Sequence, residues 1–155
     1  MKISRVVAVL MLVALSSCEK NTVYDKFERN FEEQRWQKTD VRTYEFEITQ
    51  GATNYNMDIH FAHIFGYQFP SVLLLVTIEN PDKTVTTKNI TLEITDKNGK
   101  DNGDCAGDIC DLYVNVFENL PLEVGKYKVT ISHNFQGEYL PNILGFGIEV
   151  YASID

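Results

Sequence analysis

The sequence has 155 residues, of which 44% are hydrophobic and 12% aromatic, so its composition suits one globular domain with an apolar core and not a disordered chain. The formal net charge is −8 and no cluster of Lys and Arg occurs, which excludes nucleic-acid binding by neutralisation of phosphates.

The first seventeen residues have the order of a secretory signal peptide. Lys2 and Arg5 form a basic head, and residues 6–15 are an uncharged apolar run. A helix over this run would rise about 15 Å, roughly half the thickness of the hydrocarbon core of a bilayer, so the run is too short to be a stable transmembrane anchor. We therefore expect residues 1–17 to be removed, which takes the net charge from −8 to −10.

The apolar run ends in Leu15-Ser16-Ser17-Cys18, which resembles the bacterial lipobox. In such a site the cysteine thiol accepts a diacylglyceryl group, and the small residues before it let the signal peptidase approach the backbone. Each buried acyl methylene contributes about 0.8 kcal/mol, so two or three chains hold a protein on a bilayer permanently. We predict that Cys18 is lipidated and anchors the chain in the cell envelope, on the outer membrane.

Residues 18–40 join the anchor to the rest of the chain and are polar with scattered aromatics. Tyr24, Phe27 and Phe31 fall at a loose helical spacing. The segment is interpreted either as a short helix or as an extended tether whose aromatic rings dock on the domain, and the sequence alone leaves both open.

From residue 41 the hydrophobic period changes to two. Tyr44, Phe46 and Ile48 alternate with Glu45 and Glu47, which indicates a half-buried strand. Further strands are indicated at residues 55–61, 72–76, 90–94, 112–116, 125–131 and 146–150. The unbroken apolar run at 72–76 predicts a central strand covered on both faces.

No helical pattern separates these segments, so we expect an all-β fold, an antiparallel two-sheet β-sandwich of about seven strands over residues 41–155. The alternation predicts six core residues in particular: Phe46, Ile59, Leu74, Leu92, Val129 and Ile148.

Two cysteines lie in an acidic, glycine-rich loop of a chain that leaves the reducing cytoplasm. We predict a disulfide between Cys105 and Cys110. A zinc site would need two further ligands, Cys18 is expected to carry lipid, and the histidine closest in sequence, His133, has no neighbouring histidine. We therefore expect neither a metal nor another cofactor.

The same region, residues 96–111, contains five aspartates, and oxygen-rich loops can bind calcium. An EF-hand register that begins at Asp96 places Lys100 at the fifth ligand position, where an oxygen is required. A solvated acidic loop is the favoured interpretation, and calcium binding stays open.

The sequence carries no nucleophile elbow, HExxH motif, phosphate-binding loop or dinucleotide fingerprint. His60 and His63 are three residues apart on a predicted strand and therefore face opposite sides. Glu45 and Glu47 share a face, as a glycosidase pair would, but carboxylates two apart on one strand usually face water. We expect no enzymatic activity.

An aromatic cluster spans residues 65–70, in which Tyr67 and Phe69 are the candidate residues of a partner or ligand surface. Exposed rings of this kind stack on sugars or peptides. The alternative, which we favour, is a packed connection that caps the open end of the core.

Taken in order, several short segments resemble the GldH gliding-motility lipoproteins of Bacteroidota. These segments are Val23-Tyr24-Asp25-Lys26-Phe27, Trp36 with Lys38 and Asp40, Phe46-Glu47-Ile48, Tyr67-Gln68-Phe69-Pro70, Glu79-Asn80-Pro81, 96–99, Gly125-Lys126-Tyr127 and Leu144-Gly145-Phe146-Gly147-Ile148-Glu149. The resemblance covers nearly the whole mature chain and implies a non-catalytic envelope lipoprotein that supports gliding and the associated protein-export machinery through other envelope or motility proteins. The alternative is a surface glycan-binding lipoprotein of a nutrient-uptake system, which exposed aromatic rings would favour.

Overall fold

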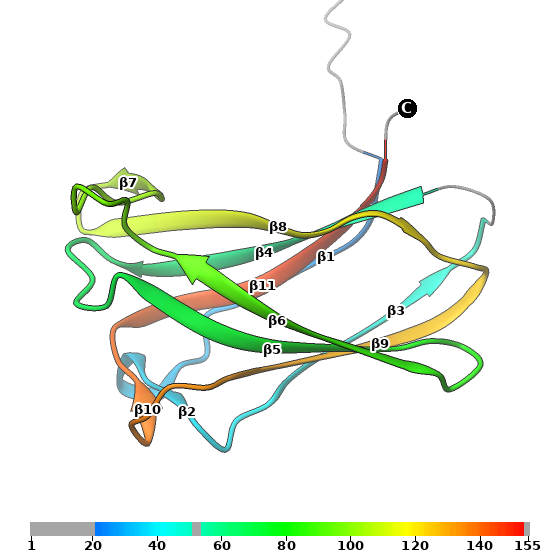
Figure 1. The fold of residues 1–155 in the computed structure, drawn as a ribbon, viewed down its shortest axis with the longest axis horizontal. Coiled ribbons are helices and arrows are strands. Elements are labelled where there is room, and N and C mark those ends of the chain that lie inside the picture. The colour runs from blue at the N-terminus through cyan, green and yellow to red at the C-terminus, as the bar shows by residue number, and fades with distance from the viewer. Residues whose placement is uncertain (1–20, 51–53, 154–155) are drawn as a thin grey trace, which may run out of the picture.

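The computed structural model describes residues 21–50 and 54–153, which form two facing antiparallel sheets with a short ribbon at one end (Figure 1). The expected signal peptide, residues 1–17, and the lipid-acceptor Cys18 lie outside the described residues. In the part of the chain that is described, no helix is long and apolar enough to cross a bilayer.

The first sheet contains, in spatial order, β1 (Thr22–Glu28), β11 (Ile143–Ala152), β4 (Asn54–Ile64), β8 (Ile109–Pro121) and β7 (Asp104–Ala106). The second contains β3 (Arg42–Ile48), β9 (Gly125–His133), β5 (Ser71–Glu79) and β6 (Val85–Glu93). The ribbon pairs β2 (Trp36–Gln37) with β10 (Tyr139–Leu140). The predicted all-β sandwich is confirmed.

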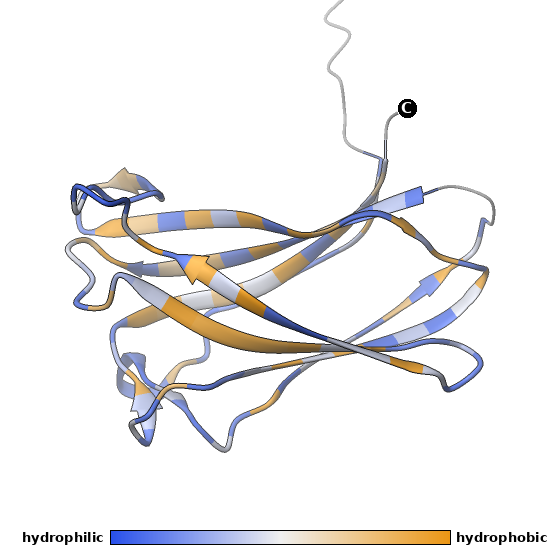
Figure 2. Cartoon of the chain, in the orientation of Figure 1, coloured by the Kyte–Doolittle hydropathy of each residue, from blue (hydrophilic) through white to orange (hydrophobic). Residues whose placement is uncertain are grey.

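All seven segments that the sequence indicated are strands, namely β3, β4, β5, β6, β8, β9 and β11. The six predicted core residues are all buried between the two sheets. The burial of one face follows from the sequence pattern. Figure 2 shows that apolar and polar residues alternate along strands such as β6 and β8. Apolar side chains on alternate positions meet across the sandwich, while the intervening polar side chains reach water.

The expectation that residues 72–76 are covered on both faces is wrong. In β5, Leu73 and Leu75 are 38% and 40% exposed, whereas Leu74 between them is fully buried. Although β5 lies between β9 and β6, its sheet has only one partner layer, so the other face meets solvent.

Of the two interpretations of the segment before residue 41, its described part, residues 21–40, agrees with the extended one, whose aromatic rings dock on the domain. Residues 22–28 form β1, which pairs with β11, and a 3₁₀ turn, η2 (Glu32–Gln34), follows it. The sheet therefore includes a strand that precedes the expected domain start at residue 41. Tyr24 contributes to the core by packing against Phe46, with ring centroids 5.3 Å apart. Pairing with β11 satisfies the backbone of this segment, which an isolated tether would leave to water.

One end of the sandwich is closed around Trp36, which is fully buried. Its ring lies 4.7 Å from that of Phe146 and its indole N–H donates to the carbonyl oxygen of Asp40 at 2.8 Å. A buried indole needs such a partner, and the turn after β2 supplies it. The β7–β8 hairpin with the cysteines lies at the same end of the strands, because Ile143, just after β10, pairs with His63 and His63 pairs with Cys110 (Figure 1).

Candidate functional site

Cys105 and Cys110 are joined by a disulfide, as predicted. The two residues are direct partners in the β7–β8 hairpin, with Cα atoms 4.0 Å apart and an S–S distance of 2.02 Å. Gly107, with φ at +63°, lies between them and provides the left-handed backbone that the turn requires. The bridge therefore ties the edge strand β7 to the sheet.

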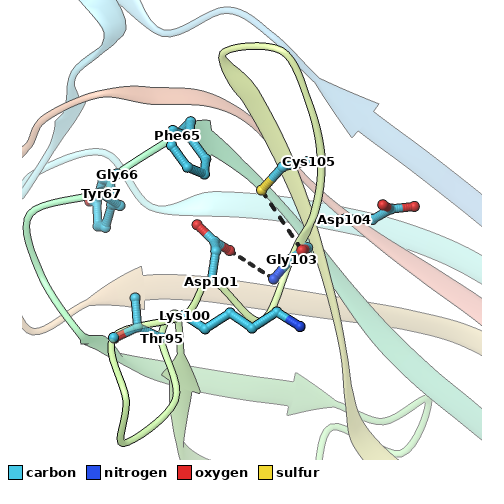
Figure 3. A pocket seen from close by; sticks show the side chains of 10 residues that line it. Phe65, Gly66, Tyr67, Thr95, Lys100, Asp101, Gly103, Asp104 and Cys105 are labelled. Carbon is cyan, nitrogen blue, oxygen red and sulfur yellow. Dashed lines mark hydrogen bonds between the residues drawn. The ribbon is translucent and has the colours of Figure 1, made fainter.

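A cavity of about 540 Å³ lies beside the disulfide (Figure 3). Its wall includes Phe65, Tyr67, Lys100, Asp101 and Cys105, which come from the connection after β4, from the loop before β7 and from β7 itself. Two segments distant in sequence thus form one pocket at this end of the sandwich.

The candidate partner or ligand surface at Tyr67 and Phe69 is not an exposed platform. Tyr67 is 5% exposed and meets Phe61 edge-on, and Phe69 is half-buried against Phe135 at 4.8 Å. Burial raises the pKa of the Tyr67 hydroxyl above its usual range. These rings are packed together because the connection caps the core, which is the favoured alternative of the two. Phe65, 61% exposed, is the ring that reaches water.

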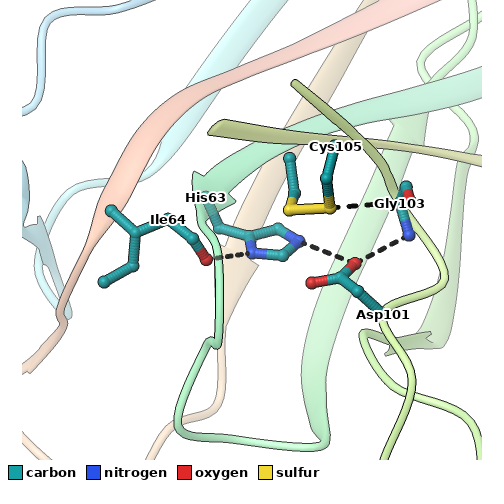
Figure 4. Close-up of a disulfide and its surroundings, with 6 residues drawn as sticks. His63, Ile64, Asp101, Gly103 and Cys105 are labelled. Carbon is teal, nitrogen blue, oxygen red and sulfur yellow. Dashed lines mark hydrogen bonds and ion pairs between the residues drawn. A yellow bond between two sulfur atoms is a disulfide. The ribbon is translucent and has the colours of Figure 1, made fainter. Parts of the chain in front are cut away.

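His63 points into the protein near the disulfide and His60 points to the outer face, as their spacing predicted. His63 is fully buried, with Nδ1 2.9 Å from the carbonyl oxygen of Ile64 (Figure 4). Its Nε2 faces the carboxylate of Asp101, 3.6 Å from Oδ1. Sequence reasoning missed this pair, because 38 positions separate its members and no local pattern links them.

The acidic loop uses carboxylates to hold its own backbone. Asp96 accepts hydrogen bonds from the backbone N–H groups of Lys100 and Asn98, at 2.9 and 2.7 Å, and these bonds lower the pKa of its carboxyl group. Asp101 likewise accepts from the backbone of Gly103 at 2.8 Å. Hydrogen bonds from backbone N–H groups to these aspartate carboxylates thus close the turns of the loop, which is a common role of Asp in loops.

A row of rings crosses the outer face of the five-stranded sheet, which sequence reasoning also missed. Phe27, Gly147, His60 and Tyr113 are successive register partners on β1, β11, β4 and β8. The ring of Phe27 stacks on His60 at 4.0 Å, and His60 stacks on Tyr113 at 4.2 Å. The absence of a side chain at Gly145, two positions before Gly147 on β11, lets the Phe27 ring reach across that strand. Glycines at alternate positions of a strand are the signal that could have indicated this close approach.

Glu45 and Glu47 lie on the outer face of β3, as expected of carboxylates that face water. Their register partners on β9 are Lys128 and Lys126. Opposite charges directly across a strand pair stabilise a sheet modestly, so this arrangement accounts for both glutamates.

Comparisons with known proteins agree on one family. The family model described as GldH lipoprotein matches residues 22–150. A protein of Christiangramia forsetii named gliding motility lipoprotein GldH homolog is 27% identical over 124 residues, which are 79% of this chain and 75% of that protein.

Two solved structures are similar only at low level. Dimeric latent PorU from Porphyromonas gingivalis has a TM-score of 0.35 and 10% identity, and the match covers 88% of this chain and 14% of PorU. The infectious bursal disease virus Gx strain structure has a TM-score of 0.27 and 12% identity, with 84% of this chain and 33% of the viral chain covered. Neither likeness bears on function.

Proposed function

Because this chain belongs to the GldH lipoprotein family, we propose that it is a non-catalytic envelope lipoprotein that serves gliding motility and the protein export associated with it. The observation that carries the proposal is the extent of the family match. Residues 22–150 run from the first residue of β1 to within two residues of the end of β11, so the match spans both sheets.

The proposal includes a lipid anchor on Cys18, cleavage after residue 17 and a position on the outer membrane. Asn21, three residues after Cys18, accepts a hydrogen bond from the backbone of Ala152 at 2.9 Å, which fixes where the chain enters the sheet. Next to Ala152 on β4 is Tyr55, and His63 lies at the other end of that strand. The strand rises about 27 Å between them at about 3.4 Å per residue. The disulfide end is thus the end farther from the lipid, where it is free to meet protein partners.

A role in assembly also fits the way in which the polar groups are used. His60 lies 2.6 Å from Asp111 with rings stacked on it, and His133 bonds to the carbonyl oxygen of Trp36 at 3.0 Å. Both imidazoles therefore have a structural role, because they connect strands and turns. This use of the histidines agrees with a binding module whose rigid faces contact other envelope proteins.

Deletion of the gene in its own host tests the proposal, with colony spreading, single-cell movement and the secreted proteins as readouts. We expect movement, secretion or both to fail in the deletion strain. The wild-type chain should restore them, and the Cys18→Ala chain should not. Unchanged movement together with unchanged secretion would contradict the proposal. Affinity purification of the tagged chain from the envelope then identifies the partners.

A second candidate function, glycan binding, is favoured by one observation. Tyr113 at the end of the ring row is 60% exposed, and flat exposed aromatic groups suit sugar stacking. Binding of wild-type and Tyr113→Ala proteins to a panel of polysaccharides tests it. Retention of wild type alone would support this function, and no retention of either would remove it.

A further inference from the structure

Four potential metal ligands converge at the disulfide end of the sandwich. His63 and Cys110 are register partners across β4 and β8, and Cys110 and Cys105 are partners across β8 and β7. Asp101 approaches from the loop before β7. We call these residues the distal cluster: His63, Asp101, Cys105 and Cys110.

The cluster is compact in the oxidised chain. One ligand atom each from His63, Asp101 and Cys110 lie within 4.8 Å of one another, and the sulfur of Cys105 is bonded to that of Cys110 (Figure 4). Three of the four residues stand on neighbouring paired strands. Ligands held on strands keep their relative positions better than ligands on loops, so the site is largely formed in advance.

The polar atoms of the cluster point to a cation. The carbonyl oxygen of Ile64 can only accept, so Nδ1 of His63 carries the proton, and in the neutral ring Nε2 presents a lone pair. That lone pair faces the Asp101 carboxylate at 3.6 Å, beyond hydrogen-bond length. Among the described residues, neither His63 Nε2 nor Asp101 Oδ2 has a hydrogen-bond partner, and both atoms are buried. The His63 side chain is 0% exposed and that of Asp101 is 9% exposed.

We propose that the distal cluster binds a zinc ion once the disulfide is reduced. An imidazole, a carboxylate and two thiolates make the four-ligand set that suits tetrahedral zinc. Calcium and magnesium are excluded by the same set, since they require oxygen ligands. In the oxidised chain each sulfur is bonded to the other and is no thiolate, so reduction supplies half of the ligands.

The chemistry balances with a dithiol as reductant. Its two thiols attack in turn, the Cys105–Cys110 bond breaks and the reductant closes to its own disulfide. Two electrons and two protons thereby pass to the two cysteines. Zinc binding then displaces both protons from the thiols to water, and His63 contributes neutral Nε2. The cavity lined by Asp101 and Cys105 offers the ion a route from solvent (Figure 3).

The sequence alone predicts no zinc site, because the two cysteines lack two further ligands nearby and the histidine closest in sequence is His133. The fold brings instead a histidine from β4, 42 positions before Cys105, and an aspartate from the preceding loop. The proposal stands independently of the function proposed above, because it rests only on the cluster's geometry.

Cobalt titration of the full chain tests the proposal. The chain carries Cys18→Ala, so that only two thiols are counted, and is purified in detergent, reduced with dithiothreitol and desalted without oxygen. We expect one Co²⁺ per chain, with a thiolate-to-cobalt charge-transfer band and the intense visible bands of a tetrahedral ion, all lost on addition of one equivalent of zinc. The oxidised chain should show no charge-transfer band.

Two matched variants assign the ligands. Asp101→Asn keeps an oxygen for the Gly103 amide but removes the carboxylate charge, and we expect its affinity for cobalt to fall by roughly tenfold or more. Asp108→Asn, in the exposed hairpin turn between the cysteines, should bind as the parent does. Absence of the charge-transfer band in the reduced parent overturns the proposal whatever the variants do. Equal cobalt affinity in the oxidised and reduced chains, or in the parent and a folded Asp101→Asn variant, overturns it as well.

Discussion

The ring of Phe27 occupies the space that a side chain at Gly145 would fill. Phe27 belongs to β1 and Gly145 to β11. The first and last strands of the domain therefore pack closely because Gly145 has no side chain to displace the Phe27 ring. The neighbouring Gly147 serves differently, since a Cβ there would meet the backbone carbonyl oxygen of Lys26.

This difference predicts the outcome of a double-mutant cycle. Gly145→Ala and Gly147→Ala should each lower the free energy of unfolding by about 1–3 kcal/mol, because each adds a carbon to a filled space. In a Phe27→Ala background the cost of Gly145→Ala should nearly vanish, whereas that of Gly147→Ala should persist, because its obstacle is backbone. Urea unfolding measures both, and equal costs of the two changes in that background would contradict the geometry.

Arg42 fastens the segment after β1 to the second sheet. Its guanidinium donates to Asn30 at 2.9 Å and to Asp40 at 2.5 Å and lies 4.1 Å from the centroid of the Phe31 ring. Arg42→Lys should cost about 1–3 kcal/mol of stability, because an ammonium group cannot reproduce the forked bonds and the stacking.

The matched control for this change is Arg35→Lys, since Arg35 is 41% exposed and pairs with Glu33 at the surface. It should change the unfolding free energy by less than about 0.5 kcal/mol. Thermal unfolding of both variants decides the matter, and a tolerated Arg42→Lys change would rule out the clamp.

The burial of His133 predicts that the free energy of unfolding decreases in mild acid. Burial lowers its pKa below the usual 6.5, and both ring nitrogens are used in the neutral form, with Nε2 donating to Trp36 and Nδ1 accepting from Phe135. The unfolded chain takes up a proton near pH 6.5, while the folded chain does so only at lower pH. Stability therefore falls as pH drops from about 6.5 to the lowered pKa, and this contribution changes no further below it.

Long-range ¹H–¹⁵N spectra of the imidazole should find His133 neutral, with the proton on Nε2, at about pH 6.5. In urea unfolding between about pH 7.5 and about pH 5.5, the His133→Gln variant should lose less stability than the wild type. An imidazolium at His133 at neutral pH would refute the assignment.

The disulfide should stabilise a loop and leave the sandwich independent of it. The closed ring is short, so removing it with Cys105→Ser and Cys110→Ser together should cost about 2 kcal/mol. Changes in amide chemical shifts should stay near β7 and its loop. The non-reduced, denatured protein should react with no thiol reagent at these two positions, and two reactive thiols per chain would contradict the bridge.

Cys18→Ala should leave an uncleaved precursor without lipid, because the thiol is the acceptor that the lipobox presents. Intact mass and membrane fractionation measure this. Ser17→Ala keeps a small residue before the cysteine and should be processed normally. A mature, unlipidated wild-type protein that begins at another residue would disprove the anchor.

The sequence was sufficient for the features that depend on local patterns. Alternation such as that of Tyr44, Phe46 and Ile48 predicted six strands and a buried face, because successive side chains of a strand point to opposite sides, and an unbroken apolar run predicted a seventh strand. Nearness in the chain, with the oxidising compartment, predicted the bridge between Cys105 and Cys110. The family resemblance likewise came from short segments in order.

Only the tertiary structure decided what depends on pairing between distant segments. The polar segment around Phe27 has no clear alternation, and it is a strand because β11 offers it an edge and two glycines to cover. The apolar run around Leu75 gave no sign that one of its faces is open, because that depends on how many layers the domain has. His63 and Asp101 meet because the end of β4 and the end of the loop before β7 lie side by side. The register of β4, β8 and β7 produces this arrangement, and non-local hydrogen bonds and core packing determine that register together. No local sequence pattern encodes it.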